Sequence, residues 1–229
     1  MYNHTTFMKM GEIKIQLSES TLIAFDLDGT LTTADFRSSW QAVHEFFGTW
    51  KTHGEPILQR FLRGELTYYE FDKADAEVWI DRTEDEYQKA LDTIKLREGI
   101  HELISFLKEK RCKLAIISMG LDDIVKRVAA QFGFDHWIGN ELIRNHNRIT
   151  GKVKVNIGWG EKGNELRKIL ALFQIPPKNS IAIGDSTADI DMFEVAGFSI
   201  AIEPSSERVA DAADFVCQTT DLKEIISLF

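Results

Sequence analysis

Five short apolar runs recur along the chain and limit the folds open to it. They are TLIAFD (21–26), KLAIIS (113–118), SIAIGD (180–185), FSIAIE (198–203) and DFVC (214–217). Each run has the length of a buried strand and is too short to form a helix. Between several of them, apolar residues recur at helical spacing, as in Ile100, Leu103, Ile104 and Leu107. Strands that alternate with helices predict an α/β fold with a Rossmann-like parallel sheet.

The segment from about residue 36 to 95 breaks this alternation. It holds no apolar run of strand length, and three stretches have helical character: 56–64, 67–80 and 83–94. Thr83, with Glu86 three residues later, has the pattern of a capping box. We therefore expect a small helical cap (35–95) inserted after the first strand of a core made of 21–34 and 96–229, with 1–20 as a polar N-terminal extension.

Residues 137–155, WIGNELIRNHNRITGKVKV, alternate in character and contain turn residues at their centre. This pattern favours a β-hairpin or flap. The sequence has no internal repeat, low-complexity tract or linker between independent domains. We expect one core that carries one insert.

Charge and cysteine content exclude several classes of function. The formal net charge of -9 argues against a nucleic-acid partner, because that binding depends on clustered Lys and Arg. No stretch approaches the length of a membrane span, and the first 20 residues lack the apolar centre of a signal peptide. The two cysteines, Cys112 and Cys217, have neither zinc spacing nor the density of a disulfide framework. We expect a cytoplasmic protein with no nucleic-acid or membrane partner, and the sequence does not determine its oligomeric state.

Acidic and hydroxyl side chains mark the ends of three predicted strands. Asp26 and Asp28 come after the first apolar run, Ser118 closes the second, and Asp185 and Asp189 come after the third. In open α/β sheets, ligands bind in the crevice beyond the carboxyl ends of the strands. We expect these five side chains to meet there.

Lys162, just before a predicted helix in GWGEKGNEL, should join this group. Four carboxylates in one crevice repel each other unless a cation neutralises them. Mg²⁺ prefers such oxygen ligands and commonly lies between carboxylates and a phosphate. A hydroxyl, an ammonium and backbone amides beside the metal are the groups that an anion needs. The set predicts a phosphoryl group held by Mg²⁺ and Lys162 next to a nucleophile.

In this order, DLDGTLT, Ser118, Lys162 and GDSTADIDM resemble the four motifs of the haloacid dehalogenase superfamily of phosphohydrolases, over about residues 22–214. The helical insert, with Gly64 and ELTYYEF, is similar to the phosphoserine phosphatase branch. The resemblance implies a Mg²⁺-dependent phosphomonoester hydrolase. Its substrate would be a small phosphorylated metabolite and its intermediate an aspartyl phosphate.

The resemblance also implies a role for each motif residue. Asp26 matches the nucleophile, and Asp28 matches the general acid that later acts as the base. Asp185 matches the metal ligand that acts with Asp26 and with the backbone carbonyl of Asp28.

The remaining motif positions match groups around the phosphate. Ser118 and Lys162 match the phosphate-binding motifs. Met119, where the family commonly has glycine, lies in the same phosphate-binding segment. Asp189 matches an acid that orients Lys162 and metal-bound water.

The cap departs from the phosphoserine phosphatase pattern. Asp75 falls where that branch has an arginine for the substrate carboxylate, and Asp35 falls where it has a glutamate for the amine. With an aromatic such as Tyr68 nearby, these acids lead to the hypothesis that the substrate carries an amine, as in phosphoethanolamine or phosphocholine. If the alignment is shifted by one helical turn, Arg63 meets a carboxylate and phosphoserine is restored. Pairing of Asp75 with a base such as Arg63 or Lys73 would instead make Asp75 structural.

Two other functions use the same groups. A phosphotransferase or phosphomutase would pass the phosphoryl group from Asp26 to an acceptor other than water. A receiver domain would keep an aspartyl phosphate as a switch, but such domains are smaller and lack a helical insert. Asp28 favours hydrolysis, because it provides an acid and base at the reacting centre.

Overall fold

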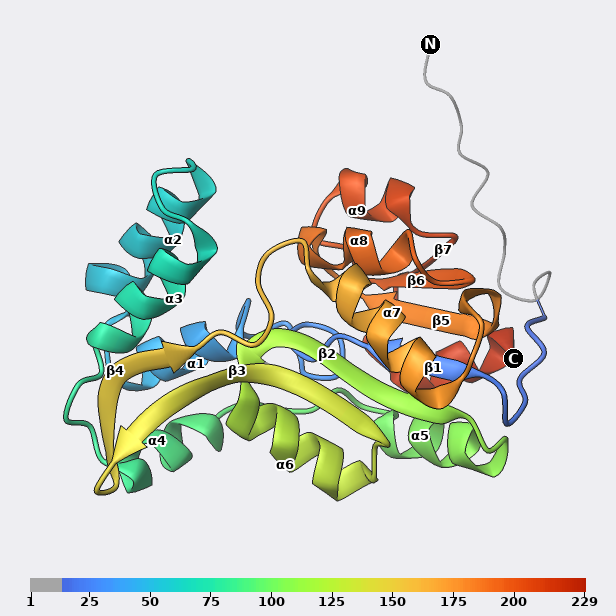
Figure 1. The fold of residues 1–229 in the computed structure, drawn as a ribbon, viewed down its shortest axis with the longest axis horizontal. Coiled ribbons are helices and arrows are strands. Elements are labelled where there is room, and N and C mark those ends of the chain that lie inside the picture. Colours follow the sequence, from blue (N-terminus) through green and yellow to red (C-terminus); the bar gives the residue numbers. More distant parts are fainter. Residues whose placement is uncertain (1–13) are drawn as a thin grey trace, which may run out of the picture.

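The computed structural model describes residues 14–229 of the 229-residue chain. Of the expected N-terminal extension, residues 1–13 lie outside the described residues. At the centre is a seven-stranded sheet with the order β4-β3-β2-β1-β5-β6-β7 (Figure 1). Its strands are β1 (Leu22–Phe25), β2 (Lys113–Leu121), β3 (His136–Asn145), β4 (Arg148–Lys154), β5 (Ser180–Gly184), β6 (Phe198–Ile202) and β7 (Phe215–Cys217). Each neighbouring pair is parallel except β3 and β4, which confirms the Rossmann-like α/β class.

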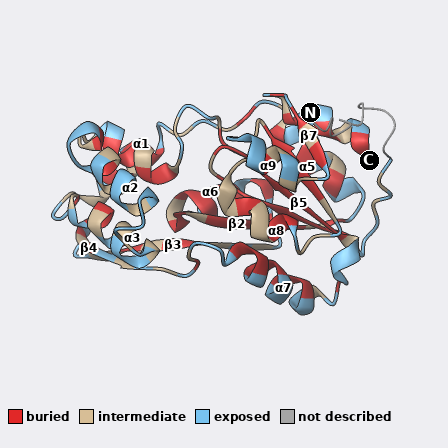
Figure 2. Cartoon of the chain, turned by 90° about the horizontal axis from the view of Figure 1, so that it is seen from above, coloured by how far each residue is buried: buried red, intermediate tan, exposed pale blue. Residues whose placement is uncertain are grey.

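Helices cover both faces of the sheet. On one face lie α5 (Ile100–Glu109) and α6 (Asp122–Phe132), and on the other lie α7 (Lys162–Phe173), α8 (Ile190–Phe193) and α9 (Glu207–Ala212) (Figure 1). The central strands are buried on both faces, as the red ribbon in Figure 2 shows. A 3₁₀ helix (Leu222–Leu228) ends the chain against α5. Within residues 14–229, no helix combines the length and apolar character that a bilayer crossing requires.

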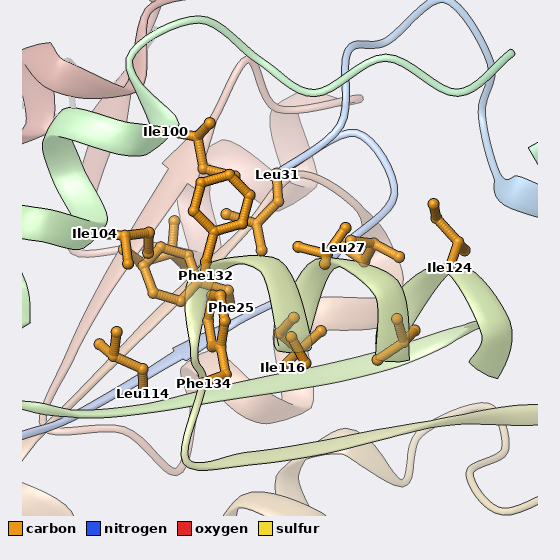
Figure 3. Close-up of a cluster of buried hydrophobic side chains, with 14 of the residues drawn as sticks. Phe25, Leu27, Leu31, Ile100, Ile104, Leu114, Ile116, Ile124, Phe132 and Phe134 are labelled. Atoms are coloured by element: carbon orange, nitrogen blue, oxygen red, sulfur yellow. The ribbon is translucent and has the colours of Figure 1, made fainter. Parts of the chain in front are cut away.

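Alternation along β1 explains why it is apolar throughout. Ile23 and Phe25 enter the core under α5 and α6, whereas Leu22 and Ala24 enter the second core under α7. Successive residues of a strand point to opposite faces, so a strand with helices on both sides must be apolar at every position. Figure 3 shows Phe25 beside Phe134 in the first core. Their rings pack edge to face, with 5.9 Å between the ring centroids.

The segment between β1 and α5 is helical, as predicted. It contains α1 (Ser39–Phe46), a π-type turn (Trp50–Gly54), α2 (Glu55–Leu62), α3 (Tyr68–Glu77) and α4 (Glu84–Leu91). The predicted capping box of Thr83 and Glu86 is present, and Thr67 with Glu70 forms a second one. Fully buried Trp79 stacks on Trp40 at 5.6 Å and fills the interior of this insert.

The predicted hairpin is formed by β3 and β4. It is not a separate flap, because β3 also pairs in parallel with β2 and so extends the main sheet. The insert rests on this extension: α3 packs against β4, and the amide of Asp81 donates a hydrogen bond to the carbonyl of Ile149. The hairpin therefore supports the insert at one end of the sheet (Figure 1).

Shortening a buried leucine should be far more costly than shortening an exposed one. Leu107 on α5 is fully buried, whereas Leu172 on α7 is 63% exposed. We expect Leu107→Ala to lower the free energy of unfolding by about 2–5 kcal/mol and Leu172→Ala by less than about 0.5 kcal/mol. Urea unfolding of the two variants measures this. Equal losses would contradict the core assignment.

Candidate active site

The carboxyl ends of β1, β2 and β5 meet at one place and carry polar side chains there. Asp26 follows β1 and donates its amide to the carbonyl of Ile183 at 2.9 Å, which continues the pairing with β5. Ser118 lies near the end of β2, and Asp185 follows β5. Lys162 is the first residue of α7. Sheet topology thus brings together residues that are distant in the sequence: Asp26 and Asp185 are 159 positions apart (185 − 26).

Lys162 contacts two carboxylates of the site. Its Nζ lies 2.7 Å from Oδ1 of Asp26 and 2.6 Å from Oδ1 of Asp189, and all three side chains are at least nine-tenths buried. A buried ammonium is costly unless it is paired. Burial lowers the pKa of Lys162, but the charges of Asp189 and Asp26 outweigh it and hold that pKa above its ordinary value. Lys162 is therefore a cation.

One ammonium does not balance the carboxylates around it. Burial, only partly opposed by Lys162, raises the pKa of Asp26 to about 7. Burial also raises the pKa of Asp28, and that of Asp185 is raised by burial and by the charges of Asp189 and Asp26. These shifts indicate an excess of negative charge. A divalent cation bound among oxygen ligands would relieve it.

Oxygens of Asp26, Asp185 and Asp189 lie within 4.8 Å of one another, close enough to share a metal ion. Asp189 is already fully engaged: Oδ1 accepts from Lys162, and Oδ2 accepts from the amides of Asp185 and Ser186. Asp26 and Asp185 are therefore the carboxylates that fit a metal. Asp189 fits the role of holding Lys162.

Gly29 allows the loop after β1 to approach the carboxylate of Asp185. It has a φ of +78°, and a Cβ atom at this position would lie 2.5 Å from Oδ2 of Asp185. Its carbonyl accepts a 2.6 Å hydrogen bond from Nη2 of Arg97, which is 3% exposed and also pairs with Glu203. Sequence reasoning missed Arg97, since it belongs to no motif. Its only signal was its position where the chain returns from the insert to α5.

Ser118 and Met119 lie where β2 turns toward α6. The hydroxyl of Ser118 is 1% exposed and accepts a hydrogen bond from the amide of Gly120 at 3.0 Å. A Cβ atom on Gly120 would lie 2.4 Å from Oδ2 of Asp28, so backbone and carboxylate touch there. The same Cβ atom would lie 3.1 Å from Oγ of Ser118, so Ser118 and Asp28 lie on the same side of Gly120.

The carbonyl of Met119 fastens the insert to the sheet. It accepts hydrogen bonds from Nε1 of Trp40 (3.2 Å), Oη of Tyr68 (3.1 Å) and Nδ2 of Asn140 (3.2 Å). Trp40 and Tyr68 belong to α1 and α3, and Asn140 belongs to β3. The strand segment predicted to bind phosphate is thus directly connected to two helices of the insert.

Asp72 is buried in the same interface. It is 0% exposed, and its Oδ2 accepts from Nδ2 of Asn140 at 3.0 Å. Its Oδ1 accepts no hydrogen bond from any residue in the range 14–229. Burial raises the pKa of Asp72 well above its ordinary value. The hydrogen bond with Tyr68 partly opposes this rise in pKa, and the charge of Asp75 adds to it. Neither Asp72 nor Asn140 stood out in the sequence, because each depends on a contact between the insert and the hairpin.

Asp75 is buried inside the insert beside a base. It is 2% exposed, and its Oδ1 lies 3.2 Å from Nε2 of His44, whose ring packs on Trp79 at 4.7 Å. Its base is therefore His44 and neither Arg63 nor Lys73. A carboxylate enclosed in this way stabilises the insert and is not free to bind an amine.

Asp35 and Arg63 are both exposed, and each contacts a different partner. Asp35 is exposed, accepts from the hydroxyl of Thr33 at 3.0 Å and lies 3.7 Å from Lys95. Arg63 is exposed at the end of α2 and pairs with Glu65 at 2.6 Å. Of the cap residues singled out in the sequence, Tyr68 is the one that reaches the sheet.

Aromatic side chains of the insert pack against the loop that leads to Lys162. The ring of Phe61 lies 5.5 Å from Trp159, 5.0 Å from Phe71 and 5.9 Å from Tyr68. Trp159 is 47% exposed and precedes Lys162 by three residues. These contacts close the insert over the site from the side of α7.

Asp28 and Asp185 are partly exposed, and the cleft that borders Asp28 is narrow. This cleft has essentially no volume accessible to water and is lined by Asp28, Thr32, Thr33, Phe36, Ser38, Ser39, Ile94 and Lys95. The lining comes from the two connections between insert and core.

Comparison with known proteins places these observations in a family. A family model described as haloacid dehalogenase-like hydrolase matches residues 21–197, which is most of the chain. A phosphoserine phosphatase from Archaeoglobus fulgidus is 31% identical over 199 residues, covering 86% of this chain and 56% of that protein. The chain thus spans little more than half of this relative. A phosphoserine phosphatase from Methanocaldococcus jannaschii is 29% identical over 209 residues, covering 90% of this chain and 95% of that protein.

A solved structure described as a phospho-aspartyl intermediate analogue of phosphoserine phosphatase is similar in fold. It is 27% identical, covers 92% of this chain and 98% of that one, and has a TM-score of 0.80. The likeness extends over both the sheet and the insert, because nearly the whole of each chain is covered.

The burial of Asp72 should make stability depend on pH in a way that asparagine removes. Its pKa in the folded protein is raised above that of the unfolded chain, so the free energy of unfolding falls as the pH rises between these two values. Between about pH 5 and about pH 8, we expect the free energy of unfolding to fall less in Asp72→Asn than in the wild type, as measured by urea unfolding. Exposed Asp211→Asn is the control and should keep the wild-type slope. An unchanged slope in Asp72→Asn would refute the assignment.

Proposed function

The chain belongs to the haloacid dehalogenase-like hydrolases, and from that premise we propose that it is a Mg²⁺-dependent phosphomonoester hydrolase that works through an aspartyl phosphate on Asp26. The observation that carries this proposal is Lys162 held between Asp26 and Asp189, with Asp28 and Ser118 at the same edge of the sheet. A paired cation beside a nucleophile and a hydroxyl suits an anionic substrate.

In the first step, a carboxylate oxygen of Asp26 attacks phosphorus, and the bond from phosphorus to the ester oxygen breaks. Asp28 gives its proton to the departing oxygen, which leaves as an alcohol. Ser118 and Lys162 bind the phosphoryl oxygens, and Lys162 offsets the negative charge on the acyl phosphate. Asp26 is then phosphorylated and Asp28 is an anion.

In the second step, Asp28 accepts a proton from a water molecule, whose oxygen attacks phosphorus. The bond between Asp26 and phosphorus breaks, inorganic phosphate leaves, and both aspartates return to their starting forms. Asp26, Asp185 and the backbone carbonyl of Asp28 would hold Mg²⁺, which when bound supplies positive charge that screens the carboxylates from the phosphoryl group. Asp189 keeps Lys162 in place throughout.

Opening of the insert would precede binding. The cleft beside Asp28 is narrow, and the contacts of Met119 with Trp40 and Tyr68 hold the insert against the end of β2. Closure after binding would exclude bulk water from the phosphorylated intermediate. The proposed boundaries of this moving unit are residues 35–95.

Phosphoserine is the substrate to test first, because the relatives are phosphoserine phosphatases. Asp75 gives no support to an amine-bearing substrate, since His44 occupies it. We also propose a reducing, cytoplasmic setting. It is supported by Cys112 and Cys217, which are free and buried thiols.

The protein should release inorganic phosphate from small phosphomonoesters when Mg²⁺ is present and no acceptor is added. The assay uses p-nitrophenyl phosphate, phosphoserine, phosphoethanolamine and phosphocholine, with and without EDTA. Asp26→Asn should lose activity by about a thousandfold or more, because it lacks the nucleophile. The same change at exposed Asp211 should leave the rate unchanged.

Three outcomes would count against the proposal. Activity retained by Asp26→Asn would exclude this nucleophile, and activity that survives EDTA would exclude the metal. Phosphate release only with an added acceptor would indicate a phosphotransferase or mutase. Labelling of the protein without turnover would indicate a receiver-like switch.

A further inference from the structure

Ser39 connects the insert to the acid of the proposed reaction. It is the first residue of α1 and is 1% exposed. Its Oγ donates a 2.9 Å hydrogen bond to Oδ2 of Asp28 and accepts one of 2.9 Å from the amide of Leu121, at the end of β2. One hydroxyl therefore joins α1, β2 and the segment that carries Asp28.

A serine hydroxyl has one proton and two acceptor positions, so the acceptor that its proton reaches sets the direction of this hydrogen bond. The Leu121 amide occupies an acceptor position on Oγ. Oδ2 of Asp28 is the acceptor that the hydroxyl reaches within residues 14–229. Gly120 packs beside this contact, because a Cβ there would lie 2.4 Å from Oδ2 of Asp28 and 2.6 Å from Oγ of Ser39. Little space remains for either group to turn.

We propose that Ser39 is a positioning residue that holds Oδ2 of Asp28 as an acceptor, so that the proton for the leaving group is carried on Oδ1. In a carboxylic acid, the oxygen without the proton is the better acceptor, and Ser39 selects Oδ2 for that role. The proton then lies on a fixed atom, and the carboxyl group is not free to rotate it away. Orientation of this kind lowers the barrier to proton transfer.

The position of Ser39 couples the acid to closure of the insert. Trp40, the next residue, donates to the carbonyl of Met119, so docking of α1 brings both contacts together. Opening of α1 would withdraw the hydroxyl from Asp28 at the same time. This inference rests on the proposed function, in which Asp28 protonates the departing oxygen.

The test is the dependence of rate on the leaving group. An alkoxide needs a proton to depart, whereas p-nitrophenolate departs readily without one. We measure kcat/KM, which reports the steps up to departure, for phosphoserine and p-nitrophenyl phosphate with Mg²⁺; phosphoethanolamine replaces phosphoserine if phosphoserine is not turned over. Ser39→Ala should lower kcat/KM by about tenfold or more for the alkyl ester and by less than about threefold for p-nitrophenyl phosphate.

Ser38→Ala is the matched control. Ser38 caps α1 by accepting from the amide of Gln41 at 3.2 Å and forms no hydrogen bond with Asp28 among the described contacts. Its loss should lower the free energy of unfolding by about 0.5–2 kcal/mol and affect both esters alike. Ser39→Thr keeps the hydroxyl and should restore the alkyl ester rate. Ser39→Cys has a similar volume but only a weak donor, so it should show the same selective loss of kcat/KM for the alkyl ester. It replaces Ser39→Ala if Ser39→Ala does not fold.

Equal loss on both esters, or no loss on either, in the variants that lack the hydroxyl would overturn the inference. If the variants show such a pattern while the wild type hydrolyses p-nitrophenyl phosphate, this inference fails and the proposed function stands. A wild type that hydrolyses none of the esters would overturn the proposed function and this inference with it.

Discussion

Lys162 lies between Asp26 and Asp189, and this buried contact joins the end of β1, the end of β5 and the start of α7. Removing Lys162 would leave two buried carboxylates without their cation, which is costly. The pairing also explains the composition of the site. One ammonium among several carboxylates leaves excess negative charge, and that excess suits a divalent metal and, once the metal is bound, an anionic substrate.

The insert is held over this site by polar contacts that converge on the end of β2. Trp40 and Tyr68 donate to the carbonyl of Met119, and Ser39 donates to Asp28. Apolar contacts hold the insert as well, because Trp79 and Leu91 belong to the same buried core as Leu121. Lifting of the insert would break the polar contacts as a group. The fold thus combines a rigid sheet that fixes the reacting groups with a docked insert that completes them.

The sequence was sufficient to predict the sheet, because buried strands are apolar at every position and are separated by helices with their own period. Parallel topology then accounts for the meeting of Asp26 and Asp185, which follow different strands. Contacts across the insert could not be predicted in the same way. Asp75 and His44 are 31 residues apart in the sequence (75 − 44). Gly29 and Arg97 are 68 residues apart (97 − 29). No local pattern in the chain marks them, since each pair joins distant segments that meet only when the chain folds.

The central claim is that Asp26 carries the phosphoryl group during the reaction, and trapping that intermediate tests it most directly. The protein is mixed with Mg²⁺ and an excess of p-nitrophenyl phosphate, quenched in acid within the first turnovers, digested and analysed by mass spectrometry. The account predicts phosphate on the peptide that contains Asp26, and none after Asp26→Asn. Turnover with no phosphorylated peptide, or with phosphate on Ser118 or another residue, would contradict it.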